Sequence, residues 1–364
     1  MATSSESAIA TYNSSPHLSS STPRVSPPLS STVKFGVIGY GYWGPNVVRN
    51  LQTTTGAEIA AVCDKSSAAR KKVHKSYPQV YVTADASEIA TSPEIDAVAI
   101  VTPVWTHFDL AKAALENGKH VFVEKPFTSN VNQAETLIEL ALKQNLRIMV
   151  DHTFLFTGAV KKIKQLLQEG LLGKLYYYDS TRVNLGLFQH DINVVWDLAP
   201  HDLSIMDYVI EGSPEALVAT GQKHLNGYED IAFITLYFPN QVIAHVNVNW
   251  LSPVKVRTTL IGGEKKMLVW NDLEADEKVK VYDKGVKITS REGVYELLVS
   301  YRSGDIWTPQ LEQVEALRQE LNYFVDCVTA DKEPFNNGSA GLRVVRMLEA
   351  ANESMNRKGA FVRL

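Results

Sequence analysis

The chain has 364 residues, of which 45% are hydrophobic and 21% charged, and its formal net charge is -4. This length exceeds the roughly 250–300 residues at which a single core stops growing, so we expect two domains. The balanced charge, without a basic stripe, argues against a nucleic-acid partner. The apolar runs are far shorter than the roughly 18–20 residues of a membrane span, which argues against a membrane partner.

Residues 1–32 form a tail rich in Ser, Thr and Pro, in which only Glu6 and Arg24 carry charged side chains. Such a segment buries too little apolar area to offset its chain entropy, so we expect it to be disordered. A Ser-rich leader also suggests an organellar transit peptide, but the single arginine and the lack of an amphipathic stripe favour a cytoplasmic protein. Cys63 and Cys327 are expected to be buried free thiols.

A short strand at 34–38 runs into G-x-G-x-x-G at 39–44, and a helix is predicted from 45 to 51. In this context the first glycine permits a tight turn and the second lets a pyrophosphate approach the backbone. The third glycine lets the helix pack close to the strand, while free amides at the helix start meet the phosphate charge. The cofactor-binding candidates in this turn are Gly39, Gly41, Tyr42, Trp43 and Gly44.

The next predicted strand, 58–64, ends in Asp64, twenty residues after the last glycine. A carboxylate here would hold the ribose 2'-hydroxyl of NAD and repel the 2'-phosphate of NADP. Lys65, with Arg70 and two lysines behind it, could accommodate that phosphate. NAD is therefore the favoured cofactor, and NADP is the alternative.

The same strand–helix rhythm continues, with strands at 95–101, 119–123 and 147–150 and helices at 108–117 and 131–143. This alternation predicts a doubly wound parallel sheet. Lys125 directly follows one of these buried strands, where an unpaired ammonium is costly to bury. Ligands bind at the carboxyl ends of parallel strands, so Lys125 is well placed for chemistry.

After a predicted helix at about 160–170, alternating runs appear at 175–184, 231–238 and 241–250, with further strands near 256–261, 266–270 and 278–288. Alternation of period two with one polar face predicts a largely antiparallel sheet that is open on one side.

Asp197 and His201 are separated by one helical turn and would project from the same face of a helix. Pro200 fits if it lies in the first turn, where its missing amide costs little. Imidazole titrates near neutral pH, and an adjacent carboxylate can fix its tautomer and favour the imidazolium. An ordinary N-cap followed by a surface histidine explains the pair equally well.

Four motifs follow one another along the sequence: the glycine turn, Thr102-Pro103-x-x-x-His107, Glu124-Lys125-Pro126 and Asp197-x-x-x-His201. They resemble the glucose-fructose oxidoreductase, inositol dehydrogenase and rhizopine catabolism (Gfo/Idh/MocA) family. Within that family, the stretches at 41–46, 182–188 and 196–202 are most similar to UDP-N-acetylglucosamine 3-dehydrogenases. The resemblance implies an α/β fold: a Rossmann domain at 33–155 and an α+β domain at 156–364 with a large, mostly antiparallel open sheet. A terminal helix at about 340–357 would return toward the first domain.

The resemblance also implies roles for individual residues. His201 would take the proton of a sugar hydroxyl, Lys125 would hold the oxygen, and Asp197 would orient the substrate or the pair. A cis Lys125–Pro126 bond would aim the lysine into the cleft. Further cofactor contacts are implied for Thr102, Pro103, His107, Glu124 and Lys125. Apart from the resemblance, polar residues on or after the strand at 175–184 lie near the catalytic pair in sequence and are the substrate-binding candidates: Arg182, Asn184, Gln189, His190 and Asn193. Arg182 is the natural partner for a diphosphate, although a solvated polar residue explains each of these positions equally well.

We therefore expect an NAD(P)-dependent oxidoreductase, with NAD favoured, that transfers a hydride between the nicotinamide and a hydroxyl-bearing carbon of a small-molecule sugar or nucleotide sugar. The favoured position is carbon 3 of a nucleotide sugar such as UDP-N-acetylglucosamine. The alternatives are an inositol or other polyol dehydrogenase and an NAD-dependent glycosidase that uses transient oxidation. A cofactor-binding regulator without turnover is the least favoured. No metal-ligand spacing is present, so no metal is expected, and the family resemblance implies a homodimer or homotetramer.

Overall fold

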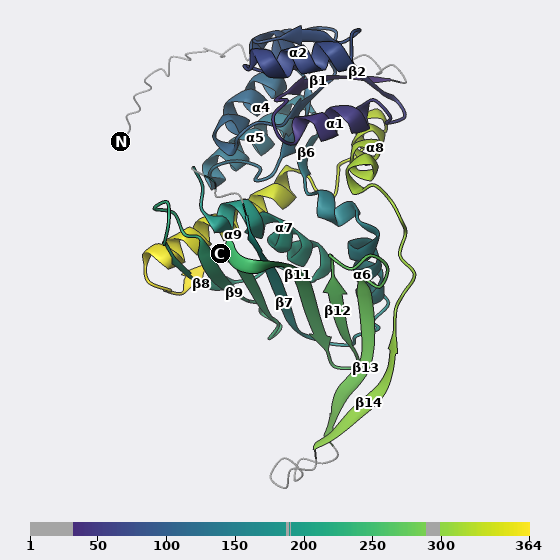
Figure 1. Cartoon of the computed structure of the whole chain (residues 1–364), viewed down its shortest axis with the longest axis vertical. Coiled ribbons are helices and arrows are strands. Elements are labelled where there is room, and N and C mark those ends of the chain that lie inside the picture. Colours follow the sequence, from purple (N-terminus) through teal and green to yellow (C-terminus); the bar gives the residue numbers. More distant parts are fainter. Residues whose placement is uncertain (1–31, 187–188, 190, 289–298) are drawn as a thin grey trace, which may run out of the picture.

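A computed structural model describes residues 32–186, 189, 191–288 and 299–364, and the predicted disordered tail lies almost entirely outside these residues. The chain folds into two β-sheets with helices around and between them (Figure 1). The first half comprises β1 (Val33–Ile38), α1 (Gly44–Leu51), β2 (Ala57–Cys63), α2 (Ser67–Ser76), β3 (Tyr81–Thr83), α3 (Ala86–Thr91), β4 (Ala97–Ile100), η1 (Val104–Thr106), α4 (His107–Glu116), β5 (His120–Glu124), α5 (Val131–Gln144) and β6 (Ile148–Asp151).

The second half comprises η2 (Thr153–Phe156), α6 (Gly158–Gln168), β7 (Leu175–Leu185), α7 (Val194–Val209), β8 (Ala216–Gln222), β9 (Ile231–Tyr237), β10 (Ile243–Asn249), β11 (Leu251–Gly263), β12 (Met267–Asn271), β13 (Val279–Ile288), β14 (Val299–Trp307), α8 (Ala316–Thr329), α9 (Gly338–Asn356) and β15 (Val362–Arg363).

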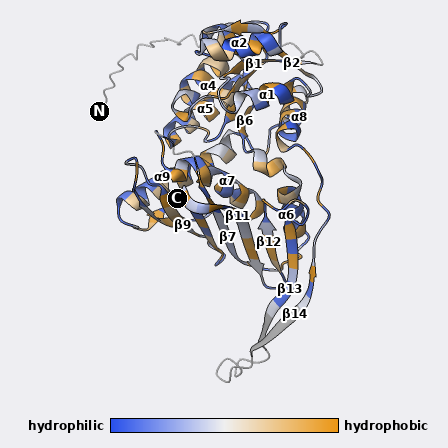
Figure 2. Ribbon diagram, viewed as in Figure 1, coloured by the Kyte–Doolittle hydropathy of each residue, from blue (hydrophilic) through white to orange (hydrophobic). Residues whose placement is uncertain are grey.

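The first sheet has the strand order β3-β2-β1-β4-β5-β6, and every pairing in it is parallel. This is the doubly wound Rossmann order, which confirms the predicted fold of this half. The order reverses between β1 and β4, so the loops that follow these two strands flank the crevice in which such sheets bind ligands. Strands β4 and β6 are buried along their whole length and β1 and β5 along most of it, whereas the edge strand β3 is partly exposed. Helix α2 at the margin is mainly hydrophilic, with Val73 as its buried residue (Figure 2).

Helix α8, from the far end of the chain, covers one face of this sheet. Its apolar side joins the core formed by β1, β4 and α1. The Phe324 ring lies 6.1 Å from the Phe35 ring and 5.9 Å from the Phe122 ring, measured between centroids. The first sheet is therefore completed by residues that lie well beyond position 155.

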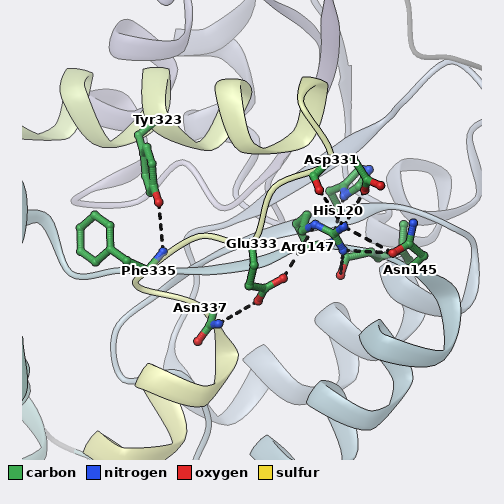
Figure 3. Close-up of polar contacts among 9 residues, drawn as sticks. His120, Asn145, Arg147, Tyr323, Asp331, Glu333, Phe335 and Asn337 are labelled. Atoms are coloured by element: carbon green, nitrogen blue, oxygen red, sulfur yellow. Dashed lines mark hydrogen bonds and ion pairs between the residues drawn. The ribbon is translucent and has the colours of Figure 1, made fainter.

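The connection from α8 to α9 closes the β6 edge of the same sheet (Figure 3). The Val150 amide donates to the Asn336 carbonyl at 2.9 Å. Arg147 pairs with Asp331 at 2.5 Å, and the Phe335 amide donates to the Tyr323 hydroxyl at 3.1 Å. Helix α9 then contacts α5 and β6 on one side and α7 and β8 on the other, so it lies between the two sheets.

The second sheet has the order β14-β13-β12-β11-β7-β10-β9-β8-β15. Its pairings are antiparallel except for β7 with β10, which is parallel. Helices α7 and α9 pack on one face, and the other face is open, as the alternating sequence predicts. Phe233, Tyr237 and Ile243 are exposed on the open face, and the β13–β14 hairpin extends away from the rest of the molecule (Figure 1).

Cys63 and Cys327 are both buried free thiols. Within the described ranges, no helix combines the length and apolar character that crossing a bilayer requires.

Candidate active site

The glycine turn after β1 is shaped for the close approach of a ligand. Gly39 has a φ of 104°, and a Cβ atom there would overlap the Val101 carbonyl, while one on Gly44 would overlap the Gly39 carbonyl. A Cβ on Gly41 would meet nothing within 4 Å. Helix α1 begins at Gly44 without a side-chain cap. The open side at Gly41 and the uncapped helix start together fit a pyrophosphate group.

Asp64 lies at the carboxyl end of β2 beside this turn. Its carboxylate accepts from the amides of Tyr40 and Ser66, each at 2.7 Å. The Arg70 guanidinium donates to the carbonyls of Asp64 and Lys65 at 2.8 and 2.9 Å. The acid is thus fixed next to the glycine turn, and Arg70 contacts the backbone behind it.

His107 joins the loops that follow β4 and β5. Its side chain is fully buried, with Nδ1 at 2.9 Å from the Pro126 carbonyl and Nε2 at 2.7 Å from the Thr102 carbonyl. Burial lowers its pKa. The predicted cofactor residues Thr102 and Pro103 therefore lie in a loop that His107 ties to the loop of Lys125.

Lys125 and Asp197 meet where the first sheet faces α7. The Lys125 ammonium donates to the Asp197 carbonyl at 2.9 Å and lies 3.9 Å from its carboxylate. The Lys125–Pro126 peptide bond is cis. The Asp197 carboxylate also accepts from the Trp250 indole N–H at 3.1 Å. Two motifs far apart in sequence thus form one cluster.

Helix α7 carries the predicted catalytic pair. Asn193 caps it by accepting from the Trp196 amide at 3.1 Å, which places Asp197 in the first turn. The expectation that Pro200 lies in the first turn is wrong, because the helix begins at Val194 and Pro200 lies inside it. Proline has no N–H, so α7 lacks one internal hydrogen bond directly before His201.

The His201 side chain packs against an aromatic ring and lies near positively charged groups. Its ring meets the Phe154 ring edge-on, at a centroid distance of 5.0 Å and an angle of 66°, and its buried Nδ1 has no hydrogen-bond partner among the residues that the structure describes. Burial, followed by the charge of Lys125, lowers the pKa of His201 well below its usual range. The expectation that Asp197 favours the imidazolium is therefore wrong. The Asp197 carboxylate contacts Trp250 and Lys125, and the described structure shows no hydrogen bond between this carboxylate and the His201 ring.

Three carboxyls gather near Lys125: Asp151 and Glu320 are buried, and Glu124 is half-buried. Burial, followed by the charge of Asp151, raises the pKa of both Glu124 and Glu320 well above the usual range. Asp151 accepts from the Trp43 indole N–H at 3.2 Å. Two of the predicted cofactor residues, Trp43 and Glu124, thus both lie next to Asp151.

The predicted substrate residues differ in their surroundings. Arg182 forms a buried ion pair with Asp202 at 2.5 Å, and Asn184 is partly buried near the end of β7. The Gln189 carbonyl accepts from Asn226 at 2.7 Å, while His190 lies outside the described residues. The side-chain amide of Asn193 donates to Glu229 and Asn352, which favours a structural role, and its substrate contact stays a prediction.

Four residues of this region were not identified from the sequence: Phe154, Asp202, Trp250 and Arg257. Asp202 directly follows His201, and this adjacency was the available signal. The other three resemble ordinary core or strand residues and come from η2 and the β10–β11 region. Among the described residues, no group of three or more His, Cys, Asp or Glu side chains could hold a metal ion.

Two family models match this chain. The model described as "Oxidoreductase family, NAD-binding Rossmann fold" matches residues 33–152, and the "GFO/IDH/MocA C-terminal domain" model matches residues 160–269. Together they reach from β1 into β12, and β13, β14 and β15 of the second sheet lie beyond the matched residues.

Three curated relatives illustrate the range of similar proteins. The uncharacterized oxidoreductase YdgJ of Escherichia coli is 36% identical over 186 residues, covering 48% of this chain and 52% of YdgJ, so that match spans about half of the relative. UDP-N-acetylglucosamine 3-dehydrogenase of Acidithiobacillus ferrooxidans is 26% identical over 322 residues, covering 86% of this chain and 94% of the relative. The scyllo-inositol 2-dehydrogenase (NAD(+)) of Bacillus subtilis is 26% identical over 317 residues, covering 83% and 88%.

Solved structures share the fold. An oxidoreductase from Agrobacterium radiobacter in complex with NAD+, L-tartaric acid and magnesium superposes with a TM-score of 0.76 at 20% identity, covering 91% of this chain and 98% of that one. The A. ferrooxidans UDP-N-acetylglucosamine 3-dehydrogenase superposes with a TM-score of 0.74 at 23% identity, covering 90% and 98%.

Proposed function

Because this chain belongs to the Gfo/Idh/MocA oxidoreductase family, we propose that it transfers a hydride between NAD and a hydroxyl-bearing carbon of a sugar. The favoured substrate is a nucleotide sugar such as UDP-N-acetylglucosamine, oxidised at carbon 3. The similarity to the A. ferrooxidans enzyme over most of both chains supports this choice.

The proposal rests on the contact between the Lys125 ammonium and the Asp197 backbone carbonyl. This contact joins the carboxyl end of β5, in the cofactor-binding half, to the first turn of α7, one turn before His201. A sugar hydroxyl at this junction would meet a cation and a buried imidazole together. The contact with Asp197 gives the ammonium a polar partner at the end of a buried strand, and it holds the cation where the proposed chemistry needs one.

The chain's own residues account for the proton transfer. The lowered pKa keeps His201 neutral, which is the form that accepts a proton from a hydroxyl. Lys125 stabilises the negative charge that develops on the oxygen. Asp197, held by Trp250, fixes the lysine in place. When bound, the nicotinamide supplies the hydride acceptor or donor.

NAD rather than NADP is supported by the Asp64 carboxylate, which backbone amides hold beside the glycine turn. A 2'-phosphate would face this negative charge. Arg70 has its guanidinium on backbone carbonyls, so it is engaged behind the acid.

A polyol substrate is the second candidate. The B. subtilis scyllo-inositol 2-dehydrogenase is as similar to this chain as the UDP-sugar enzyme, and a neutral ring hydroxyl would meet the same lysine and histidine.

The deciding experiment follows NADH absorbance with a panel of UDP-sugars and free polyols, each with NAD and with NADP. We expect NADH formation with UDP-N-acetylglucosamine and NAD. Turnover on inositols alone would favour the polyol candidate, and no turnover on any member would contradict the proposal. We further propose a cytoplasmic homodimer or homotetramer assembled through the open sheet face, which a monomer in light scattering would contradict.

A further inference from the structure

Two arginines lie opposite each other on neighbouring strands beside His201. Arg182 on β7 and Arg257 on β11 are register partners in the antiparallel pairing of these strands. Like charges at such positions repel and destabilise a sheet. Each of the two cations therefore needs a compensating negative charge.

Each guanidinium is oriented by its own carboxylate. Arg182 donates to Asp202 at 2.5 Å through Nε and at 3.3 Å through Nη2, and Arg257 donates to Asp272 at 3.2 Å through Nη1. Both guanidiniums stack on the Phe154 ring, with Cζ atoms 4.6 and 5.7 Å from its centroid. Phe154 thus holds both cations on the ring that also contacts the imidazole of His201.

Arg182 retains one donor without a partner among the described residues. Its side chain is 5% exposed, and its Nη1 atom is buried with no hydrogen bond to any residue that the structure describes. A buried donor of this kind is costly, because it has lost water and gained nothing. An incoming anionic oxygen would form a charge-assisted hydrogen bond with a group that is already desolvated. The side chain of Arg257 is 33% exposed, so an entering group can reach this cation too.

We propose that Arg182 and Arg257, stacked on Phe154, form an oxyanion subsite beside His201, which binds a negatively charged group of the substrate. The inference rests on the proposed function and narrows its substrate class to anionic sugars. A sugar carboxylate and a nucleoside diphosphate share the chemistry that two guanidinium groups recognise.

Arg257→Gln is the test variant, because Asp272 is partly exposed and tolerates the loss of its partner better than the buried Asp202 would tolerate the loss of Arg182. Arg257→Lys keeps the charge but removes the planar fork. Arg346→Gln removes an arginine from an exposed pair with Glu135 on α5 and serves as the matched control. Calorimetric titration of the NAD-loaded protein with UDP, D-glucuronate and myo-inositol measures binding without any need for turnover.

We expect Arg257→Gln to weaken the binding of at least one anion by about tenfold or more, with partial recovery in Arg257→Lys and no change in Arg346→Gln or in myo-inositol affinity. A loss confined to UDP identifies a diphosphate, and one confined to D-glucuronate identifies a sugar carboxylate. Failure of the wild type to bind either anion, unchanged anion binding in Arg257→Gln, or an equal loss for myo-inositol would overturn the subsite. If Arg257→Gln does not fold, Arg257→Lys carries the same comparison.

The same variants separate this inference from the proposed function. Anion binding that depends on Arg257 in a protein that never forms NADH would support the subsite and contradict the dehydrogenase. NADH formation together with anion affinities that the Arg257 variants do not change would support the dehydrogenase and contradict the subsite.

Discussion

Trp250 donates its indole N–H to the Asp197 carboxylate at 3.1 Å, and so links the second sheet to the first turn of α7. The carboxylate lies 3.9 Å from the Lys125 ammonium, so Trp250 acts on the lysine through Asp197. We infer that Trp250 is a positioning residue rather than part of the core alone.

Replacing Trp250 with Phe should lower kcat by about tenfold and change KM little, because the Asp197 carboxylate loses a hydrogen bond that orients it. Steady-state kinetics of NADH formation measures this. Trp270→Phe is the matched control, since Trp270 is equally buried but its indole N–H has no partner in the described structure. Equal loss of kcat in the two variants would show a packing effect only.

Lys125→Ala and His201→Ala should each lower turnover by at least about a hundredfold, because one variant loses the group that stabilises the alkoxide and the other loses the base. Both variants should still bind NAD, which a titration monitored by intrinsic fluorescence measures. Near-normal turnover in either variant would contradict the assigned roles.

The pH profile should reflect the lowered pKa of His201. A histidine with an ordinary pKa loses its basic form as pH falls through about 6.5. Burial and the neighbouring cations keep His201 neutral below that pH, so the acid limb of kcat/KM should lie below pH 6.5. A limb at or above that value would contradict the assignment of His201 as the base.

The glycine turn offers a comparison of two alanine variants. Gly41→Ala should weaken NAD binding about tenfold or more without lowering Tm, because its methyl group would enter the open space where the pyrophosphate is expected. Gly39→Ala should lower Tm, because Gly39 has a φ of 104° and its methyl group would strike the Val101 carbonyl. Thermal melts and NAD titration of both variants distinguish binding space from folding strain.

Glu320→Gln should change how stability depends on pH. The raised pKa means that the folded state holds a proton that the unfolded state releases above about pH 4.5, so wild-type stability falls as pH rises toward the folded pKa. The slope in that window is about 1.4 kcal/mol per pH unit. Glutamine keeps the oxygen that accepts from the His152 amide and Asn336, and it does not ionise.

The Glu320→Gln variant should therefore gain stability relative to wild type between pH 5 and pH 8, as measured by urea unfolding. Glu277→Gln, on an exposed carboxyl beside Lys280, is the control and should show no such gain. A constant difference between wild type and Glu320→Gln across this range would mean that Glu320 is ionised in the folded protein.

Much of the fold could be predicted because its signals are local. The glycine turn needs particular residues for steric reasons, and the strands of the second sheet alternate along the chain, as β9 and β10 show. The sequence also contains the N-cap of α7, because Asn193 directly precedes the helix. A helix predicted to begin after Asn193 would have had Pro200 inside it, as the structure shows.

Contacts between distant segments could not be predicted in the same way. Nothing local to Trp250 indicates that it faces Asp197, and Arg182 and Arg257 become neighbours only through strand register. Apolar residues from Leu317 to Val328 have the spacing of a helix, which predicts α8. This spacing does not indicate that the apolar side of α8 packs on the first sheet.

The packing of Phe324 on Phe35 and Phe122 has a consequence for biosynthesis. A ribosome releases β1 long before α8, so during most of translation one face of the first sheet lacks its cover and presents two phenylalanine rings to water. The nascent amino-terminal half should therefore engage hydrophobic-binding chaperones until the last stretch of chain emerges. A fragment ending at residue 155 should aggregate, whereas adding α8 in trans as a peptide should restore its solubility.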